Sequence, residues 1–183
     1  MKRVLGSILL ASILAFGASD VNSTQKDSNT TKVQEVPKFT LEDVNGNKIE
    51  IEQTDDGLKY NSLKDKNVIL FFYLNDGAPC QGELKTFNEF VKDKKDIEIV
   101  TIELKGLDKE ALKKYQQERN IEKFHNIVGK SAGDFVNYIA YRARWQGTVP
   151  FIIITDKKGA VKHIQIGAMN KAQLEDIYKK LNG

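Results

Sequence analysis

The chain has 183 residues, one cysteine, and a formal net charge of +3 from 28 basic and 25 acidic side chains. The charges are interspersed, so nothing in the composition points to nucleic acid as a partner. A single cysteine excludes a disulfide within one chain. His125 and His163 stand alone without ligand spacing, so we expect no metal site, and no motif calls for a cofactor.

The N-terminus has the pattern of an export signal. Lys2 and Arg3 precede an uncharged apolar stretch, residues 4–16, and small residues lie at the positions a signal peptidase reads. We therefore predict a signal peptide over residues 1–17 and a periplasmic location. The stretch is shorter than the roughly 20 apolar residues of a membrane span, so we expect membrane contact only if this segment stays uncleaved.

Two further parts follow. Residues 18–35 are rich in Ser, Thr, Asn, Asp, Gln and Lys, and such a segment buries too little apolar surface to offset its ordering entropy, which predicts a disordered linker. Residues 36–183 have the size and apolar content of one folded domain.

The domain opens with a predicted hairpin. The stretch P-K-F-T-L-E-D-V-N-G-N-K-I-E-I, residues 37–51, alternates apolar and polar residues on both sides of Asn45-Gly46, a dipeptide typical of tight turns. Residues 52–66 are polar and give no regular pattern.

A buried strand and a helix come next. Residues 67–74 are apolar on both faces, as expected of a central strand covered by helices. Apolar residues then recur at helical spacing and draw one stripe along a helix, at Cys80, Leu84, Phe87 and Val91. This spacing places Cys80 on the buried side.

The remaining pattern alternates strands and helices. We predict strands over 97–104, 151–155 and 161–166, and helices opened by Asp108, by Ser131-x-x-Asp134 and by Asn170. The first strand pair encloses a helix and is therefore parallel, whereas the last pair forms an antiparallel hairpin. The order predicts an α/β fold with a mixed central sheet flanked by helices.

Four separated motifs give this order a family resemblance. The N-terminal hairpin, the segment N-V-I-L-F-F-Y-L-N-D-G-A-P-C-Q-G-E-L, the loop Thr148-Val149-Pro150 and the strand F-I-I-I-T resemble those of the TlpA and ResA-like periplasmic thioredoxins in the AhpC/TSA redoxin superfamily. The resemblance implies a thioredoxin-like fold with an N-terminal hairpin extension. It also implies thiol-disulfide interchange with protein thiols or with a membrane or periplasmic redox partner. We expect a monomer.

The resemblance also locates a site and a departure from it. When the motifs are aligned on Cys80 and Glu83, the family's nucleophilic cysteine falls on Gly77 and its tryptophan on Asp76. Cys80 then occupies the position of the resolving cysteine. Without a second sulfur, an oxidoreductase cycle within one chain is impossible, so whether the chain is an enzyme stays open.

The same resemblance implies roles for the neighbouring residues. Glu83 corresponds to a buried or half-buried carboxylate that tunes proton transfer. Pro79, Val149 and a cis Pro150 would line a groove in which an extended peptide adds as a strand.

Three functions remain open at this stage. The first is an exported TlpA-type protein with a degenerate G-A-P-C motif that exchanges a single thiol or binds clients. The second is a one-cysteine peroxidase that acts through Cys80, as in the related peroxiredoxins. Peroxiredoxins carry a threonine three residues before this cysteine and a distant arginine, whereas this chain has Gly77 at the first position and no arginine among residues 148–150. The third is a redox-silent module that binds peptides or a partner.

Structural interpretations compete with the functional ones. Cys80 also fits a small apolar core residue. Glu83 also fits a first-turn glutamate that complements the helix dipole, which is the interpretation we favour. Tyr141 and Trp145 could line the groove, but their helical spacing favours the core.

Overall fold

The computed structural model describes residues 35–182. The predicted signal peptide and the predicted linker up to residue 34 lie outside the described residues. Within the described part, no helix is both long and apolar enough to cross a membrane.

The centre of the domain is a five-stranded sheet with the order β6-β5-β4-β7-β8. Its strands are β4 (Asn67–Tyr73), β5 (Ile97–Glu103), β6 (His125–Val128), β7 (Phe151–Thr155) and β8 (Val161–Ile166). The first three are parallel to one another, and β7 and β8 run antiparallel to their neighbours. The predicted α/β fold with a mixed sheet is confirmed, although β6 was not predicted.

A second, three-stranded sheet carries the predicted hairpin. It consists of β1 (Lys38–Glu42), β2 (Lys48–Gln53) and β3 (Leu58–Tyr60). The turn is wider than a two-residue one: Gly46 alone has a positive φ, of 89°, and the Asp43 carboxylate accepts backbone hydrogen bonds from Asn45 and Asn47. β3 lies in the stretch that we expected to be irregular.

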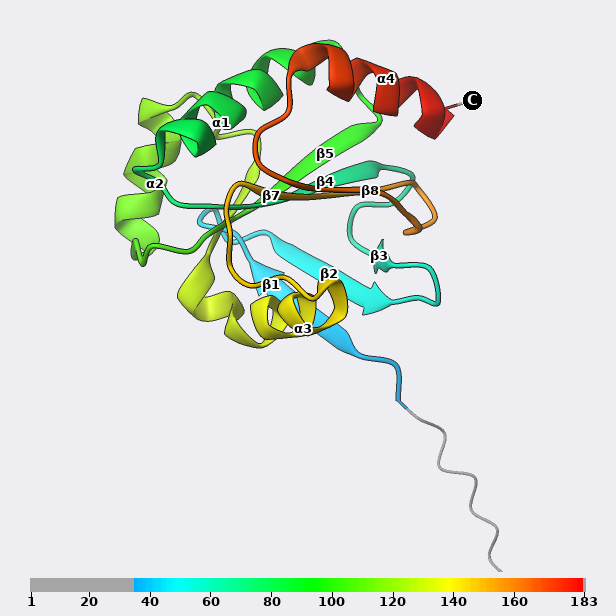
Figure 1. Ribbon diagram of the computed structural model, residues 1–183. Helices are drawn as coiled ribbons and strands as arrows, with labels where there is room; N and C mark the ends of the chain where they lie inside the picture. Colours follow the sequence, from blue (N-terminus) through cyan, green and yellow to red (C-terminus); the bar gives the residue numbers. More distant parts are fainter. Residues whose placement is uncertain (1–34, 183) are drawn as a thin grey trace, which may run out of the picture. The chain divides into compact units, whose positions relative to one another are not determined.

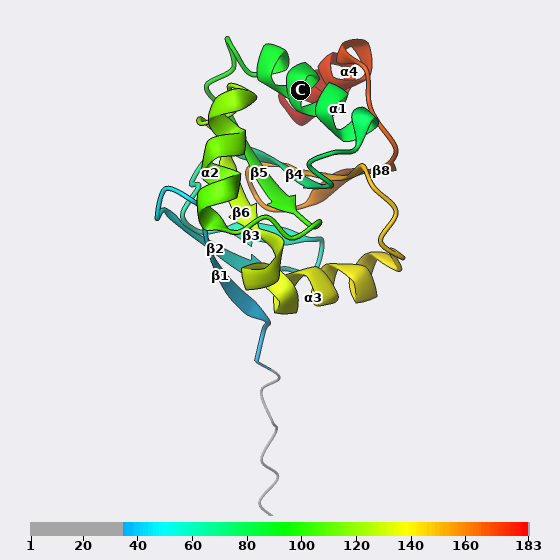
Figure 2. The same cartoon turned by 90° about the vertical axis from the view of Figure 1, so that its left-hand side faces the viewer.

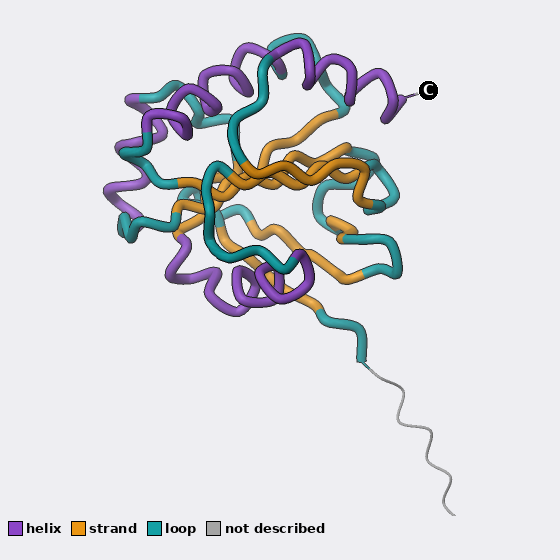
Figure 3. The backbone as a smooth tube through the Cα atoms, in the orientation of Figure 1, coloured by secondary structure: helices purple, strands orange, loops and turns teal. Residues whose placement is uncertain are grey.

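Helices cover both faces of the central sheet. They are α1 (Ala78–Phe90), α2 (Lys109–Glu118), the 3-10 turn η1 (Gly129–Ala132), α3 (Gly133–Ala143) and α4 (Lys171–Asn182). Helices α1 and α4 lie on one side of the sheet, and α3 lies on the other side with the three-stranded sheet (Figures 1 and 2). Figure 3 shows the central strands between these layers.

Strand β4 divides the core between the two faces. All seven of its residues are buried, and successive side chains point to opposite faces. Ile69, Phe71 and Tyr73 join the cluster beneath α1, α2 and α4. Val68, Leu70 and Phe72 join the cluster beneath α3 and the small sheet.

Two of the three predicted helix starts are confirmed. The Asp108 side chain accepts a hydrogen bond from Ala111 N at 2.8 Å, and the Asn170 side chain accepts one from Gln173 N at 3.0 Å. The prediction for Ser131 is wrong: its hydroxyl donates to Val128 O and lies within η1, and α3 begins only at Gly133.

Candidate functional site

The site begins where β4 ends and α1 starts. The loop from Leu74 to Gly77 joins them, Gly77 is the N-cap residue of α1, and Pro79 lies in the first turn. Proline suits this position because the first N–H groups of a helix have no intrahelical partner. The carboxyl end of a parallel strand thus meets a helix N-terminus, a common position for functional groups in α/β folds.

Hydrogen bonds fix this loop. Its residue Asn75 accepts at its carbonyl oxygen from Gln81 Nε2 at 2.9 Å and from Tyr115 OH at 3.0 Å. The Asn75 N–H donates to the buried carboxylate of Glu103, which also accepts from the backbone of the loop after β5. The Glu103 carboxylate therefore joins the loop after β4 to the loop after β5. Tyr115 and Glu103 lack any sequence motif, and their role follows only from the strand pairing that brings the loops together.

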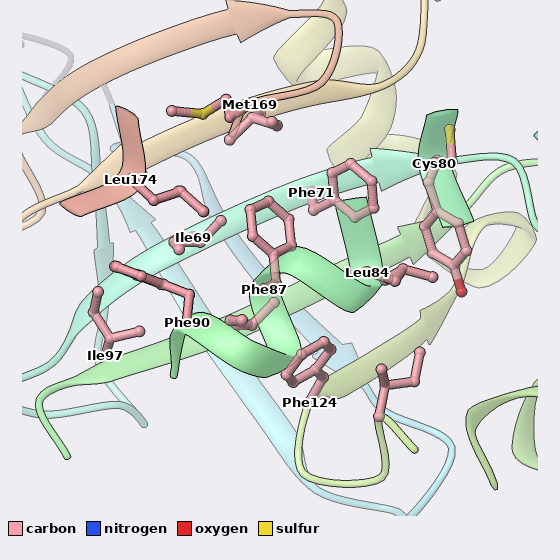
Figure 4. Packing of buried hydrophobic residues seen from close by; sticks show 14 of the residues in the cluster. Ile69, Phe71, Cys80, Leu84, Phe87, Phe90, Ile97, Phe124, Met169 and Leu174 are labelled. Atoms are coloured by element: carbon pink, nitrogen blue, oxygen red, sulfur yellow. The ribbon is translucent and has the colours of Figure 1, made fainter. Parts of the chain in front are cut away.

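Cys80 belongs to the core. Its side chain lies at one end of the cluster that includes Phe71 and Leu84 (Figure 4), and the residue is 2% exposed. Burial raises the pKa of the Cys80 thiol; a backbone hydrogen bond from Leu74 opposes this effect, and the nearby Glu83 carboxylate adds to it. The thiol is therefore protonated near neutral pH, the opposite of an activated thiolate.

A side chain at Gly77 would lie beside Cys80. A Cβ atom built on Gly77 would lie 3.4 Å from Cys80 Sγ and 3.7 Å from Cys80 Cβ. Cβ atoms of disulfide-bonded cysteines are about 3.5–4.5 Å apart. The backbone at Gly77, with φ −73° and ψ 115°, is open to any residue. A cysteine would therefore fit at this position.

Glu83 is buried one turn beyond Cys80. It is 1% exposed and not in the first turn of α1, so the helix-dipole interpretation is wrong. Its Oε2 accepts from Met169 N at 2.8 Å, and among the described residues its Oε1 has no hydrogen-bond partner. Burial raises the pKa of Glu83 to about 7, against the opposing hydrogen bond from Met169.

The second wall of the candidate site is the loop before β7. The Val149–Pro150 peptide bond is cis, as the resemblance predicted. Phe151 pairs with Phe72, so Pro150 lies near the carboxyl end of β4, where α1 begins. The Pro150 carbonyl oxygen accepts from Gly167 N at 2.8 Å, and Val149 is half-buried.

The two aromatic residues near this loop differ in their exposure to solvent. Trp145 is buried, stacks on Phe151 with ring centroids 4.7 Å apart, and donates from Nε1 to Thr148 O at 2.7 Å. It supports the loop from within the core. Tyr141 is 82% exposed, so the prediction that it belongs to the core is wrong.

No cation site emerges from the described residues. They contain no group of three His, Cys, Asp or Glu side chains that could hold a metal ion. His125 instead pairs with the buried Asp43, Nδ1 to Oδ2, at 3.0 Å.

The fold and site define a thioredoxin-fold protein with one cysteine at its motif. The profile of the AhpC/TSA family matches residues 33–164, which is most of the chain. The chain therefore belongs to the AhpC/TSA family.

The chain is also similar to individual proteins. The chain is 21% identical to the thioredoxin-like protein YneN of Bacillus subtilis over 179 residues, 96% of each chain. Among solved structures it resembles a thiol:disulfide interchange protein of the thioredoxin family from Chlorobium tepidum, with a TM-score of 0.61 and 22% identity over 80% of this chain and 94% of that one. It also resembles StoA from Bacillus subtilis, with a TM-score of 0.57 and 18% identity over 78% and 96% of the two chains. At these identities the solved structures establish the thioredoxin-like fold.

Proposed function

We propose that the chain is an exported thioredoxin-fold protein that binds an extended segment of a protein partner beside its cis-proline, without running a disulfide cycle. The observation that carries this proposal is the state of Cys80. The chain's only sulfur at the motif is 2% exposed, and burial raises its pKa. Exchange and peroxide chemistry both require an accessible thiolate.

The proposed binding surface is formed by the first turn of α1 and the loop before β7. Pro79 on the first turn of α1 faces solvent, and Val149 is half-buried in front of the cis Pro150. Backbone groups in such a loop can pair with an extended peptide, and the neighbouring side chains then select its sequence. The partner would be a protein client or an extracytoplasmic redox protein.

The experiment measures the rate of Cys80 alkylation by iodoacetamide against pH in the native protein. We expect labelling at the rate set by protein opening and no midpoint below the free-thiol value of about 8.5. Fast labelling with a lower midpoint would instead support single-thiol exchange or a peroxidase.

A matched pair of variants tests the proposed binding surface. Cys80→Ser should leave capture of a candidate partner unchanged, whereas Val149→Asp should weaken it at least tenfold. Loss of capture in Cys80→Ser, with the fold intact by circular dichroism, would contradict a redox-silent role.

Export is tested separately. The predicted signal over residues 1–17 supports an extracytoplasmic location, as does the description of one structural relative, a disulfide oxidoreductase of Mycobacterium tuberculosis, as secreted. Mass spectrometry of the protein from a secreting host should show a mature N-terminus near Ala18. An intact N-terminus in the cytosolic fraction would contradict export.

A further inference from the structure

The β8–α4 segment, residues 167–169, connects two parts of the candidate site that are far apart in the sequence. At one end, Gly167 N donates to the carbonyl oxygen of Pro150 at 2.8 Å. At the other end, Met169 N donates to Oε2 of Glu83 at 2.8 Å. Figure 1 shows the chain passing there from β8 to α4, on the side of the sheet that carries α1. The β8–α4 segment therefore links α1 to the loop that carries the cis-proline.

The β8–α4 segment is short and is fixed at both ends. Gly167 has a φ of 95°, which glycine adopts without strain, and Met169 is buried in the cluster beneath α1. Between them, Ala168 is exposed, and its carbonyl oxygen accepts from Gln165 Nε2 at 3.0 Å. Because a single residue separates the two ends, a displacement of Met169 also moves Gly167 and its hydrogen bond to the cis-proline loop.

Glu83, which holds the second end, is a buried carboxyl group that the proposed function does not use. It is 1% exposed, and among the described residues its Oε1 has no hydrogen-bond partner. An ionised carboxylate is unfavourable in such a place, because it loses water without gaining donors. Burial accordingly raises the pKa of Glu83 to about 7, although the hydrogen bond from Met169 opposes this effect.

No neighbouring charge compensates an ionised Glu83. None of the ion pairs within residues 35–182 includes it. Cys80, one turn earlier on α1, interacts with it, and burial raises the pKa of this thiol, which keeps it neutral. Burial likewise raises the pKa values of the phenols beside Cys80, Tyr73 of β4 and Tyr115 of α2. The charged residues of α4 are exposed or half-buried: Lys171, Glu175, Asp176, Lys179 and Lys180.

We propose that Glu83 is a positioning residue for the proposed binding surface: through residues 167–169 it holds the cis-proline loop to α1, and its protonation sets how often this contact opens. The inference rests on the proposed function, in which α1 and that loop form one surface. When the contact opens, the carboxyl group of Glu83 reaches water and releases its proton to solvent at an ordinary pKa. The open arrangement binds fewer protons and is therefore favoured as the pH rises from 4.5 to about 7.

Hydrogen exchange of the ¹⁵N-labelled protein, followed by NMR between pH 4.5 and 7.5, tests this inference. The amides of Gly167 and Met169 exchange when the contact opens. Their protection, corrected for the intrinsic effect of pH on exchange, should fall roughly 300-fold between pH 4.5 and 7, the factor that corresponds to the raised pKa of Glu83. Both amides should stay less protected than those of the central strand β5 and respond little to dilute urea, as expected of a local opening.

Variants of α1 assign the effect to one carboxyl group. Glu83→Gln keeps an acceptor for Met169 N but cannot ionise, so the fall should disappear. Glu83→Leu removes the acceptor, so Gly167 and Met169 should exchange faster at every pH. Glu89→Gln is the control, because Glu89 is exposed on the same helix; it should retain the full fall. The comparison of Gly167 and Met169 with β5 uses the unaltered protein and holds even if a variant fails to fold.

Four outcomes would overturn the proposal. They are no fall in protection, a fall at Met169 without one at Gly167, protection of both amides equal to that of β5, or the same pH dependence in Glu83→Gln. The second would separate Glu83 from the cis-proline loop, and the third would make the opening part of global unfolding. Partner capture by Cys80→Ser and Val149→Asp is measured independently, so its failure would count against the proposed function and leave these exchange results unchanged.

Discussion

At the level of single residues, the backbone at Gly77 would accept a side chain beside Cys80. Gly77 has an ordinary negative φ, and a side chain there would meet Cys80 at van der Waals distance. Glycine is therefore not required by the conformation of the loop. A cysteine at this position would therefore need no change in the end of β4 or the start of α1 beside it.

Gly77→Cys should accordingly form a disulfide with Cys80. The Cβ separation of 3.7 Å lies within the range of native disulfides. After oxidation, the denatured variant should show no thiol towards Ellman's reagent until dithiothreitol is added, and the reduced variant should gain insulin reductase activity. Gly82→Cys is the control, because a side chain there has no neighbour within 4 Å; its thiols should remain free.

Glu83 should make stability depend on pH. Burial raises its pKa from 4.5 to about 7 in the folded protein, so between these values the folded state binds more protons than the unfolded state. The stabilisation of the folded state by protonated Glu83 is fully present below pH 4.5 and is lost as the pH rises through 7. The loss amounts to about 3 kcal/mol.

Urea unfolding at several pH values measures this effect. In the unaltered protein the free energy of unfolding should fall between pH 4.5 and 7.5. Glu83→Gln, which retains an acceptor for Met169 N, should lack that part of the fall and be the more stable protein at pH 8. An identical pH dependence in both proteins would show that Glu83 titrates normally.

At the level of elements, two glycines differ in how closely other parts of the chain approach them. Gly129 opens η1 where it crosses the end of β5, and a Cβ atom there would lie 2.3 Å from the carbonyl oxygen of Glu103. Gly82 lies within α1, where a Cβ atom would meet nothing within 4 Å. The first glycine is required by packing, and the second is replaceable.

Alanine substitutions should therefore have opposite effects. Gly129→Ala forces β5 and η1 apart and should lower the free energy of unfolding by roughly 2 kcal/mol or more. Gly82→Ala should raise it by about 0.5–1 kcal/mol, because alanine loses less conformational entropy in a helix. Chemical denaturation at one pH measures both. Equal effects would mean that η1 relaxes away from β5 at little cost.

The elements also show what a sequence can predict. The sequence predicts long apolar or periodic segments such as β4 and α1, because the spacing of their apolar residues indicates which side chains are buried. The short strands β3 and β6 were missed, since Leu58 and Tyr60 are too few to set a period and β6 gains its pairing only from β5. The same limit applied to Glu83: its burial depends on the loop that carries Met169, far away in the sequence.

At the level of the whole molecule, the two faces of the central sheet share one strand. β4 contributes alternate side chains to the cluster that contains Cys80 and to the cluster that contains Trp145. Neither face can lose its packing without exposing one side of β4. This arrangement favours a single cooperative unfolding transition over two independent ones.

The chain supplies its own probes for this expectation, because it contains one tryptophan and one cysteine. Trp145 reports on the α3 face by fluorescence, and Cys80 reports on the α1 face by brief alkylation in increasing urea. Both transitions should have the same midpoint and the same slope, of about 1–3 kcal/mol per molar urea. Gly82→Ala lies on the Cys80 side and should shift both midpoints equally. If only the midpoint measured by cysteine alkylation shifts, the α1 face opens independently of the α3 face. Cys80 would then react without global unfolding, and this outcome would support single-thiol exchange.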